Sequence, residues 1–433
     1  MKNNIKNFQD LRIRLSLVLR HFQWLLAIAF GLWVGLVQAE EFRYRYIPLD
    51  QITLPGGAPF FPFAINNSGR VYGAACDDEL CSNTRIAYYD NGVVTVAQRV
   101  VGSTGATVVN SKGTVGGFVL VDPVNFIAQA FLSSKDKEEL IPPQPNEVFA
   151  FPITLNDKAI ALVESFSDSS PPIHALYHQG LATPLDFGLD VTNPAFINFA
   201  NFGCGKFLNN EGVIAGTTTT ADRFNGARGF RYDTKTRKTL LLNPLPSDTL
   251  AWGLGINSRS EVLGYSFVNS IVDLIPYHEN IGIWDREGHF KTYFTETISS
   301  NALLFNDNNL IVITLVPSDN NSYLIPKQGV RLNIADLVKN LPSGVKLRTI
   351  FDLNNRGDML GFDGQDSAFL LKRLNDNEPS PALNDNAVAD VSPEGKNIQP
   401  ANTTPGHFLH RHRLLMKSGA VLPEDSFEKE TIK

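Results

Sequence analysis

The residues of this 433-residue chain that could support catalysis are few, and each lacks its usual companions. His278-Glu279 supplies the first two residues of a zinc-protease helix, but no second histidine follows at the required spacing. Ser134 and Lys137 have the spacing of one β-lactamase motif, whose companion motifs are missing. The sequence also contains no Gly-x-Ser-x-Gly elbow and no phosphate-binding loop. We therefore predict no catalytic residue and no cofactor.

Asparagine and aspartate are concentrated in short polar segments, for example residues 306–309 and 363–366. Oxygen-rich loops of this kind can bind calcium. Neither segment has EF-hand spacing, and Asn and Asp are common in turns because their side chains bond to the backbone two residues later. We therefore favour a structural role and predict no metal site.

Two of the three cysteines, Cys76 and Cys81, are five positions apart in one expected hairpin loop. In an oxidising compartment such a pair forms a disulfide more readily than a metal site. Closing so short a loop would add about 2 kcal/mol of stability. Cys204 has no evident partner, and we interpret it as a buried small hydrophobic residue.

A turn signature of the form hydrophobic-Asn-x-x-Gly returns seven times, and its lead asparagines are 44 to 53 residues apart. Repeats of this length are typical of propeller blades or of paired-helix solenoids. An Asn that bonds to its own backbone, followed by a residue suited to positive φ, favours a reversal between strands and would break a helix. We predict structural turns at Asn66, Gly69, Asn110, Gly113, Asn209, Gly212, Asn257, Asn354 and Gly357, with less regular copies at Asn156 and Asn306.

Strand-forming segments surround each turn. An apolar run follows it directly, and about 20 residues after the lead Asn most repeats have a small residue before bulky ones, as in Ala87-Tyr88-Tyr89. A polar turn such as Asn91-Gly92 then leads into one more strand. Each repeat therefore reads as four antiparallel strands, which is one propeller blade.

The last repeat is one strand short, whereas residues 42–49 alternate aromatic and basic residues and belong to no repeat. We therefore predict an all-β fold, a seven-bladed β-propeller of four-stranded antiparallel blades, with the ring closed by the N-terminal strand in the last blade. In five repeats a second glycine follows the lead Asn by seven residues, and blades three and six lack both this glycine and the glycine of the turn. We favour drift in a tolerant repeat over the alternative, a specialised site on these blades.

The turn, the Val-rich strand that ends in Gly and a downstream strand such as His174-Ala175-Leu176-Tyr177 together resemble the bacterial HAF-repeat proteins, which are predicted extracellular repeat proteins. The resemblance covers about residues 42–373, although the other repeats keep the small residue and the aromatic without the histidine. It implies an envelope or secreted propeller-like domain. It brings no catalytic residues.

The N-terminus indicates export. Basic residues precede an uncharged apolar stretch, residues 24–37, and a small-residue exit at Ala39. We expect residues 1–39 to be a cleaved signal peptide, with an uncleaved inner-membrane anchor as the alternative. The propeller, residues 40–374, is then periplasmic or extracellular.

The C-terminal part, residues 375–433, reads as a disordered linker followed by a basic tail. The tail segment 407–417 is either without a fixed partner, the favoured interpretation, or contacts a membrane surface or a cell-wall polymer. A net charge of −6 without a basic stripe argues against nucleic acid as a partner.

These features favour an exported, non-catalytic propeller that acts as a binding or scaffolding module, a monomer whose partner is an envelope protein or glycan. Long inserts between second and third strands are the expected contact surface. The alternative is an envelope glycan hydrolase or lyase, which requires acidic residues from several blades to converge at the channel mouth.

Overall fold

The computed structural model describes residues 42–50, 52, 60–76, 84–98, 104–122, 127–135, 137–167, 170–189, 196–198, 206–219, 227–268, 279–296, 300–315 and 321–374. The expected signal peptide and tail lie outside these residues, as do Cys81, Cys204, His278 and much of the expected inserts. No helix in the described part of the chain is long and apolar enough to cross a membrane.

The described strands form seven groups of four, which we number in chain order. Group 1 contains β2 (Phe60–Ile65), β3 (Val71–Cys76), β4 (Thr84–Asp90) and β5 (Val93–Gln98); group 2 contains β6 (Thr104–Val109), β7 (Val115–Asp122), β8 (Ile127–Ser133) and β9 (Glu138–Ile141). Group 3 contains β10 (Phe149–Leu155), β11 (Ala161–Ser167), β12 (Ser170–His178) and β13 (Leu181–Pro184); group 4 contains β14 (Phe196–Asn198), β15 (Val213–Thr219), β16 (Arg228–Asp233) and β17 (Lys238–Leu242). Group 5 contains β18 (Leu250–Ile256), β19 (Val262–Phe267), β20 (Glu279–Trp284) and β21 (Phe290–Glu296); group 6 contains β22 (Ser300–Phe305), β23 (Ile311–Leu315), β24 (Ser322–Lys327) and β25 (Val330–Asn333). Group 7 contains β26 (Leu347–Leu353), β27 (Met359–Asp363), β28 (Ala368–Arg373) and β1 (Tyr44–Pro48).

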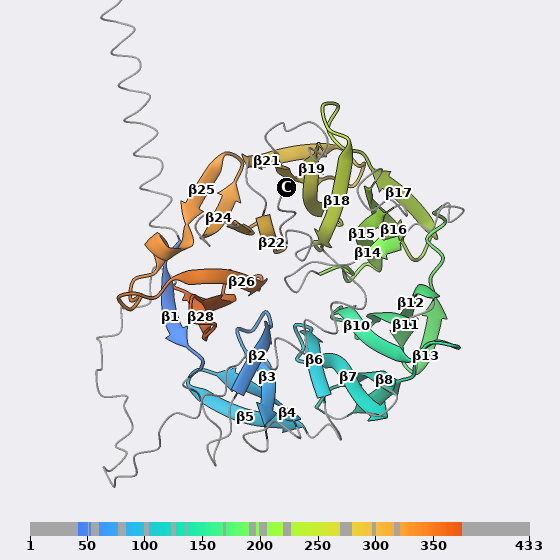
Figure 1. The fold of residues 1–433 in the computed structure, drawn as a ribbon, viewed down its shortest axis with the longest axis horizontal. Helices are drawn as coiled ribbons and strands as arrows, with labels where there is room; N and C mark the ends of the chain where they lie inside the picture. The colour runs from blue at the N-terminus through green and yellow to red at the C-terminus, as the bar shows by residue number, and fades with distance from the viewer. Residues whose placement is uncertain are drawn as a thin grey trace, which may run out of the picture.

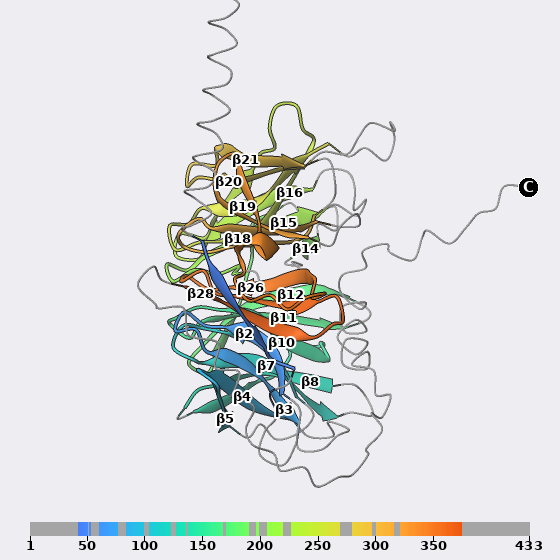
Figure 2. The same cartoon turned by 90° about the vertical axis from the view of Figure 1, so that its left-hand side faces the viewer.

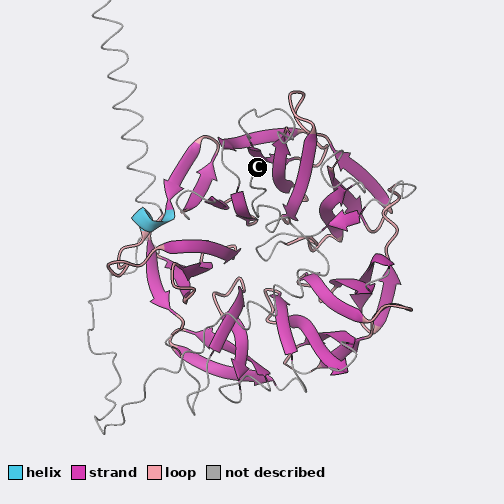
Figure 3. Cartoon of the chain, viewed as in Figure 1, coloured by secondary structure: helices cyan, strands magenta, loops and turns pink. Residues whose placement is uncertain are grey.

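The groups are arranged around a central axis, with the first strand of each group nearest to it (Figure 1). Figure 2 shows the same groups from the side. The described residues contain a single short 3-10 helix, Ile334–Leu337, drawn in cyan in Figure 3. The sequence prediction of an all-β, propeller-like chain is therefore confirmed.

The N-terminal strand lies where its alternating pattern predicted. β1 pairs antiparallel with β28, from Tyr44 opposite Arg373 to Pro48 opposite Phe369. In Figure 1 the blue β1 lies beside the orange β28, although more than 300 residues separate them. Tyr44 is fully buried in a core shared with group 6. The strand therefore contributes both backbone pairing and apolar burial to the last group.

One sheet is larger than the sequence predicted. Groups 2 and 3 join into an eight-stranded sheet through β8 and β10, which run parallel with Phe149 opposite Ala128. The Ala128 N–H donates to the Val148 carbonyl at 3.0 Å. The join is local, because it rests on a single register pair at the start of β10.

Apolar cores fill the spaces between neighbouring groups. Trp284, for example, is fully buried among Val213 and Ala215 of group 4 and Val262 of its own group. The recurring second glycine belongs to this packing. A Cβ on Gly264 would lie 1.7 Å from the Trp252 carbonyl oxygen and 2.9 Å from the Trp284 ring. The glycine is required because a cross-strand carbonyl and an aromatic ring approach it closely.

Candidate functional site

The lead asparagine of each repeat closes the turn between the first two strands of its group. The Asn66 side-chain oxygen accepts from the Ser68 and Arg70 backbone N–H groups, both at 3.0 Å. Three residues after the asparagine, Gly69 has a φ of 86°. The same region of positive φ is adopted by Ala159, Ser260 and Asn309, which replace the glycine in three repeats. The turn geometry is thus kept without the glycine.

The amide nitrogen of the same asparagines connects neighbouring groups. The Asn110 Nδ2 donates to the Asn156 carbonyl at 3.0 Å, and Asn156 donates in the same way to Asn209 at 3.0 Å. Asn209 continues the series to Asn257, Asn306 to Asn354 and Asn354 to Asn66, at 3.1, 3.0 and 3.0 Å. Asn257 instead donates to the Asn309 side-chain oxygen at 3.0 Å. We call this series the asparagine relay.

Sequence reasoning assigned the asparagines to local turns and missed the relay between groups. A signal for it exists in the residue type. Aspartate makes the same local turn elsewhere, since the Asp363 carboxylate accepts from the Gln365 and Ser367 N–H groups at 2.8 and 2.9 Å. Only asparagine adds an N–H donor. The use of Asn and never Asp at all seven lead positions indicates that the donor is needed.

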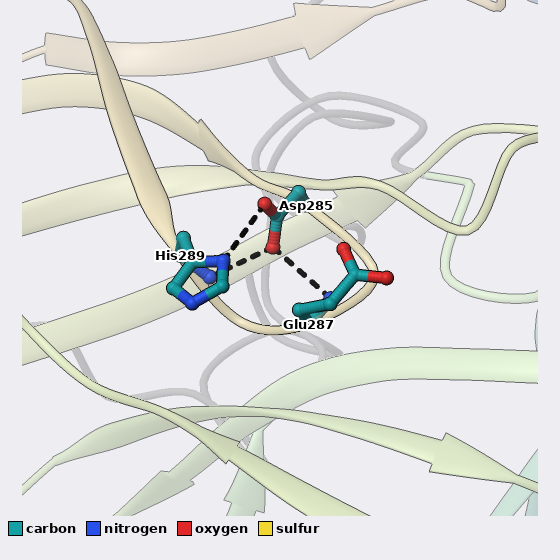
Figure 4. Close-up of side chains that lie close together, drawn as sticks. All are labelled: Asp285, Glu287 and His289. Atoms are coloured by element: carbon teal, nitrogen blue, oxygen red, sulfur yellow. Dashed lines mark hydrogen bonds and ion pairs between the residues drawn. The ribbon is translucent and has the colours of Figure 1, made fainter.

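Asp285, Glu287 and His289 form the one cluster among the described residues whose ligand atoms are close enough for a metal ion (Figure 4). They occupy the exposed turn between β20 and β21. The Asp285 carboxylate already accepts from the Glu287 and His289 backbone N–H groups, at 3.0 and 2.8 Å. Desolvation raises the pKa of Asp285, but these backbone bonds and the His289 side chain together hold it below its usual value. The hydrogen bonds of this turn are sufficient to explain why the three side chains lie close together.

The first strands of the seven groups carry almost no acid. Asp352 on β26 is the only carboxylate among the residues of these described strands. It is buried, and it accepts from the Ile65 N–H at 2.7 Å and from the Leu353 N–H at 2.8 Å. Burial raises the pKa of Asp352 to about 6, partly offset by these bonds and by the charge of Lys206. Both carboxylate oxygens therefore accept hydrogen bonds from backbone N–H groups, and the bond from Ile65 connects group 1 with group 7.

A small cavity lies beside this carboxylate. It is lined by Asp352, Lys206 and apolar residues of β18 and β22, among them Leu254 and Phe305. A cavity with one carboxylate differs from the several converging acids that a glycan hydrolase or lyase requires.

Half-buried side chains on the first strands are mainly aromatic or aliphatic. Phe61, Phe151 and Trp252 each lie five residues before the lead asparagine, in groups 1, 3 and 5. The Trp252 indole N–H is buried and has no acceptor among the described residues. An apolar, partly aromatic surface suits binding more than acid-base chemistry.

Two further sequence candidates have structural partners. Ser134 and Lys137 lie in the turn between β8 and β9, where the Ser134 N–H donates to the Lys137 carbonyl at 2.8 Å. His174 is buried, with its Nε2 2.9 Å from the Glu164 carboxylate and its ring edge-on to Phe187. Cys76 ends β3, but Cys81 lies outside the described residues, among which no disulfide is found, so the disulfide stays a prediction.

No family model matches the sequence, and no curated protein matches it. Solved structures do. The β-propeller domain of the Trilobed protease from Pyrococcus furiosus is 11% identical, with a TM-score of 0.49, over 74% of this chain and 99% of that one. YCF48 bound to a D1 peptide is 10% identical with a TM-score of 0.44, over 77% and 97% of the two chains. An ulvan lyase of polysaccharide lyase family PL25 is 10% identical with a TM-score of 0.42, over 72% and 93%.

The chain is an all-β protein with a propeller-like arrangement of sheets, and the solved structures similar to it are β-propellers. At these identities the likeness concerns the fold alone. The neighbours include a peptide-bound protein and a lyase, so they do not distinguish binding from catalysis.

Proposed function

We propose that this protein is a seven-bladed propeller that acts as a non-catalytic binding or scaffolding module outside the bacterial cytoplasm. One observation carries the proposal: the strands nearest the axis hold a single carboxylate, Asp352, whose two oxygens accept backbone N–H groups. An acid-base site needs carboxylates that are free to exchange protons with a substrate.

Closure of the ring is part of the proposal. The asparagine relay runs from the last group to the first, from Asn354 to the Asn66 carbonyl, and β1 completes the last group. A closed ring leaves no unpaired sheet edge at the junction of the chain ends. It would hold the half-buried aromatic residues of alternate groups at fixed positions.

Export rests on the sequence of residues 1–39, and the partner class on the mainly apolar, partly aromatic first strands. We propose an envelope protein or an uncharged stretch of envelope glycan as the partner. Nucleic acid is not proposed as a partner, because it favours basic proteins and the chain has a net charge of −6.

A pull-down with the full chain as bait tests this function on envelope protein extracts and on purified cell-wall glycans. We expect saturable retention of one ligand class that weakens in Trp252→Leu, because this change removes a half-buried aromatic ring from the first strand of group 5. A matched change, Tyr293→Leu on the outer strand β21, should leave retention unchanged. Absence of saturable retention by the wild type would contradict a binding role.

The glycan hydrolase or lyase is kept as a second candidate because of one observation. The pKa of Asp352, raised to about 6 by burial, suits a general acid or base near neutral pH. Shortening of a retained glycan, abolished in Asp352→Asn, would favour this candidate.

A further inference from the structure

A cluster of phenylalanines lies on groups 2 and 3, in which Phe149 is buried and Phe118, Phe151 and Phe166 are half-buried. Phe149 contacts Phe118, Phe166 and Phe151, with ring centroids 5.3, 5.0 and 6.2 Å apart, and Phe151 lies 6.0 Å from Phe166. The neighbouring Val148 is 43% exposed. We call these four phenylalanines and Val148 the phenylalanine patch. Neighbouring apolar side chains that stay partly exposed, with an exposed valine beside them, can mark an interaction surface.

The patch is built by strand register. Phe149 lies opposite Phe166 and Phe151 lies opposite Glu164 on β10 and β11, so these side chains share one face of the sheet. The Val148 N–H donates to the Phe166 carbonyl at 3.2 Å, which fixes the valine beside the rings. Because β10 runs from Phe149 toward its asparagine turn, the patch lies at the opposite end of the strand from the asparagine relay.

The stretch of sequence that contains groups 2 and 3 is acidic. Between residues 113 and 205 the sequence has ten Asp or Glu residues, three Lys and no Arg. This region therefore carries more negative charge than the whole chain, whose net charge is −6. Glu147 directly precedes Val148, and Glu164 faces Phe151 across the two strands. A ligand with both apolar and basic groups would be complementary to it.

The chain contains one such segment outside the described residues. Residues 407–417 hold five apolar side chains, Phe408, Leu409, Leu414, Leu415 and Met416, together with Arg411, Arg413, Lys417 and three histidines, and no acid. The segment is joined to Leu374 by residues 375–406, which span at most about 110 Å when fully extended. A domain of this size has a radius of gyration of about 20 Å, so the patch is within reach.

We propose that residues 407–417 dock on the phenylalanine patch of the same chain. The apolar side chains cover the rings and Val148, while the arginines lie over aromatic faces and near the bordering carboxylates. The tether raises the effective concentration of the segment to the millimolar range, so modest contacts suffice. An external partner on this surface would be another apolar and basic peptide, which must displace the segment.

Photo-crosslinking in the full chain tests this assignment. With p-benzoylphenylalanine in place of Phe408, we expect an intramolecular crosslink to residues 115–122 or 147–166, identified by mass spectrometry. Val148→Lys should reduce its yield about fivefold, because a cation then replaces an apolar contact and repels the arginines. Val93→Lys on β5 is the matched control, since Val93 is 63% exposed and lies on another group. Crosslinking should also weaken as salt is raised.

Other outcomes overturn the proposal. A crosslink elsewhere on the ring, an intermolecular product, or a yield that Val148→Lys and Val93→Lys change equally would each contradict docking on this patch. Vesicles that contain anionic lipid provide the remaining comparison. A tail that crosslinks to lipid but not to the patch, in the same full-length protein, would assign it to the membrane surface.

Discussion

At the scale of single residues, the recurring asparagine acts through both ends of its amide. Its oxygen closes a turn, and its nitrogen donates to the next repeat. An aspartate could accept the hydrogen bonds of the turn, but it could not donate one to the next repeat. The positive φ after the asparagine is maintained by Gly, Ala, Ser or Asn, so the lead residue and not the glycine is the invariant part of the turn.

Asn156→Asp should therefore destabilise the fold by about 2 to 3 kcal/mol, because it loses the bond to the Asn209 carbonyl and places a carboxylate oxygen against that acceptor. The control makes the opposite exchange, Asp285→Asn, in an exposed turn. The asparagine oxygen can still accept from the His289 N–H, so this change should alter the free energy of unfolding by less than about 0.5 kcal/mol. Urea unfolding of both variants checks the difference. Equal effects would show that the relay contributes nothing.

Asp352 should make stability depend on pH. Its pKa is raised by burial from the ordinary value of 3.8 to about 6, so the native state binds the proton more tightly than the unfolded state. The resulting contribution is complete below pH 4 and is lost as pH rises to about 6. Relative to Asp352→Asn, the wild type should lose about 2 to 3 kcal/mol between pH 4 and pH 7.5. If the free energy of unfolding depended on pH in the same way in both proteins, Asp352 would not be the group responsible.

At the scale of elements, the connections that lead into groups 3 and 5 share a sequence pattern and a serine contact that the seven repeats do not have in common. The pattern Pro-x-Pro-x-acid occurs within residues 142–147 and in residues 244–248. The Gln144 and Leu245 N–H groups donate to the hydroxyls of Ser165 and Ser266, at 3.3 and 2.7 Å. Each connection is therefore held by a serine on the second strand of the group that it enters.

Ser266→Ala should destabilise the protein by about 2 kcal/mol, because it leaves the Leu245 N–H without its acceptor and removes a 2.6 Å bond to the buried Asp248. The exposed Ser247 also donates to Asp248, at 3.1 Å, and Ser247→Ala should cost less than about 0.5 kcal/mol. Thermal unfolding compares the two. A small effect of Ser266→Ala would mean that the connection is held by other contacts.

The strands themselves were predictable because turn residues and periodicity are local signals. The bonds that join the groups were not predictable, because they connect residues far apart in the sequence, such as Asn110 and Asn156, which are 46 residues apart. Group 3 shows the same limit. Val163 replaces a glycine there, and Ala150 stands where Phe60 covers the equivalent Gly73 of group 1. The smaller Ala150 removes the ring contact that Phe60 makes with Gly73, which is one of the two contacts that exclude a side chain there, and a single sequence does not reveal this packing.

At the scale of the whole molecule, the first and last described strands pair in group 7. Tyr44 of β1 is fully buried in a core that includes Leu324 of group 6 and Phe369 of β28, and its hydroxyl has no hydrogen-bond partner among the described residues. Burial raises the pKa of this hydroxyl, which therefore stays protonated. The side chain stabilises the junction through its ring alone.

Tyr44→Ala should cost about 3 to 5 kcal/mol by opening a cavity at the junction. Tyr44→Phe should be neutral or stabilising by up to about 1 kcal/mol, since it removes a buried hydroxyl that lacks a partner. Denaturant midpoints at constant m-value check the pair. An N-terminal strand that was not part of the ring would leave both variants indistinguishable from the wild type.

The central claim, that the propeller binds without catalysis, is tested most directly by product analysis on retained envelope glycans. Full-length wild type and Asp352→Asn are incubated with each glycan, and new reducing or unsaturated ends are measured by mass spectrometry. We predict binding without new ends for both proteins, because the one carboxylate on the first strands is bound to the Ile65 and Leu353 N–H groups. Formation of new ends by the wild type, lost in Asp352→Asn, would contradict the account.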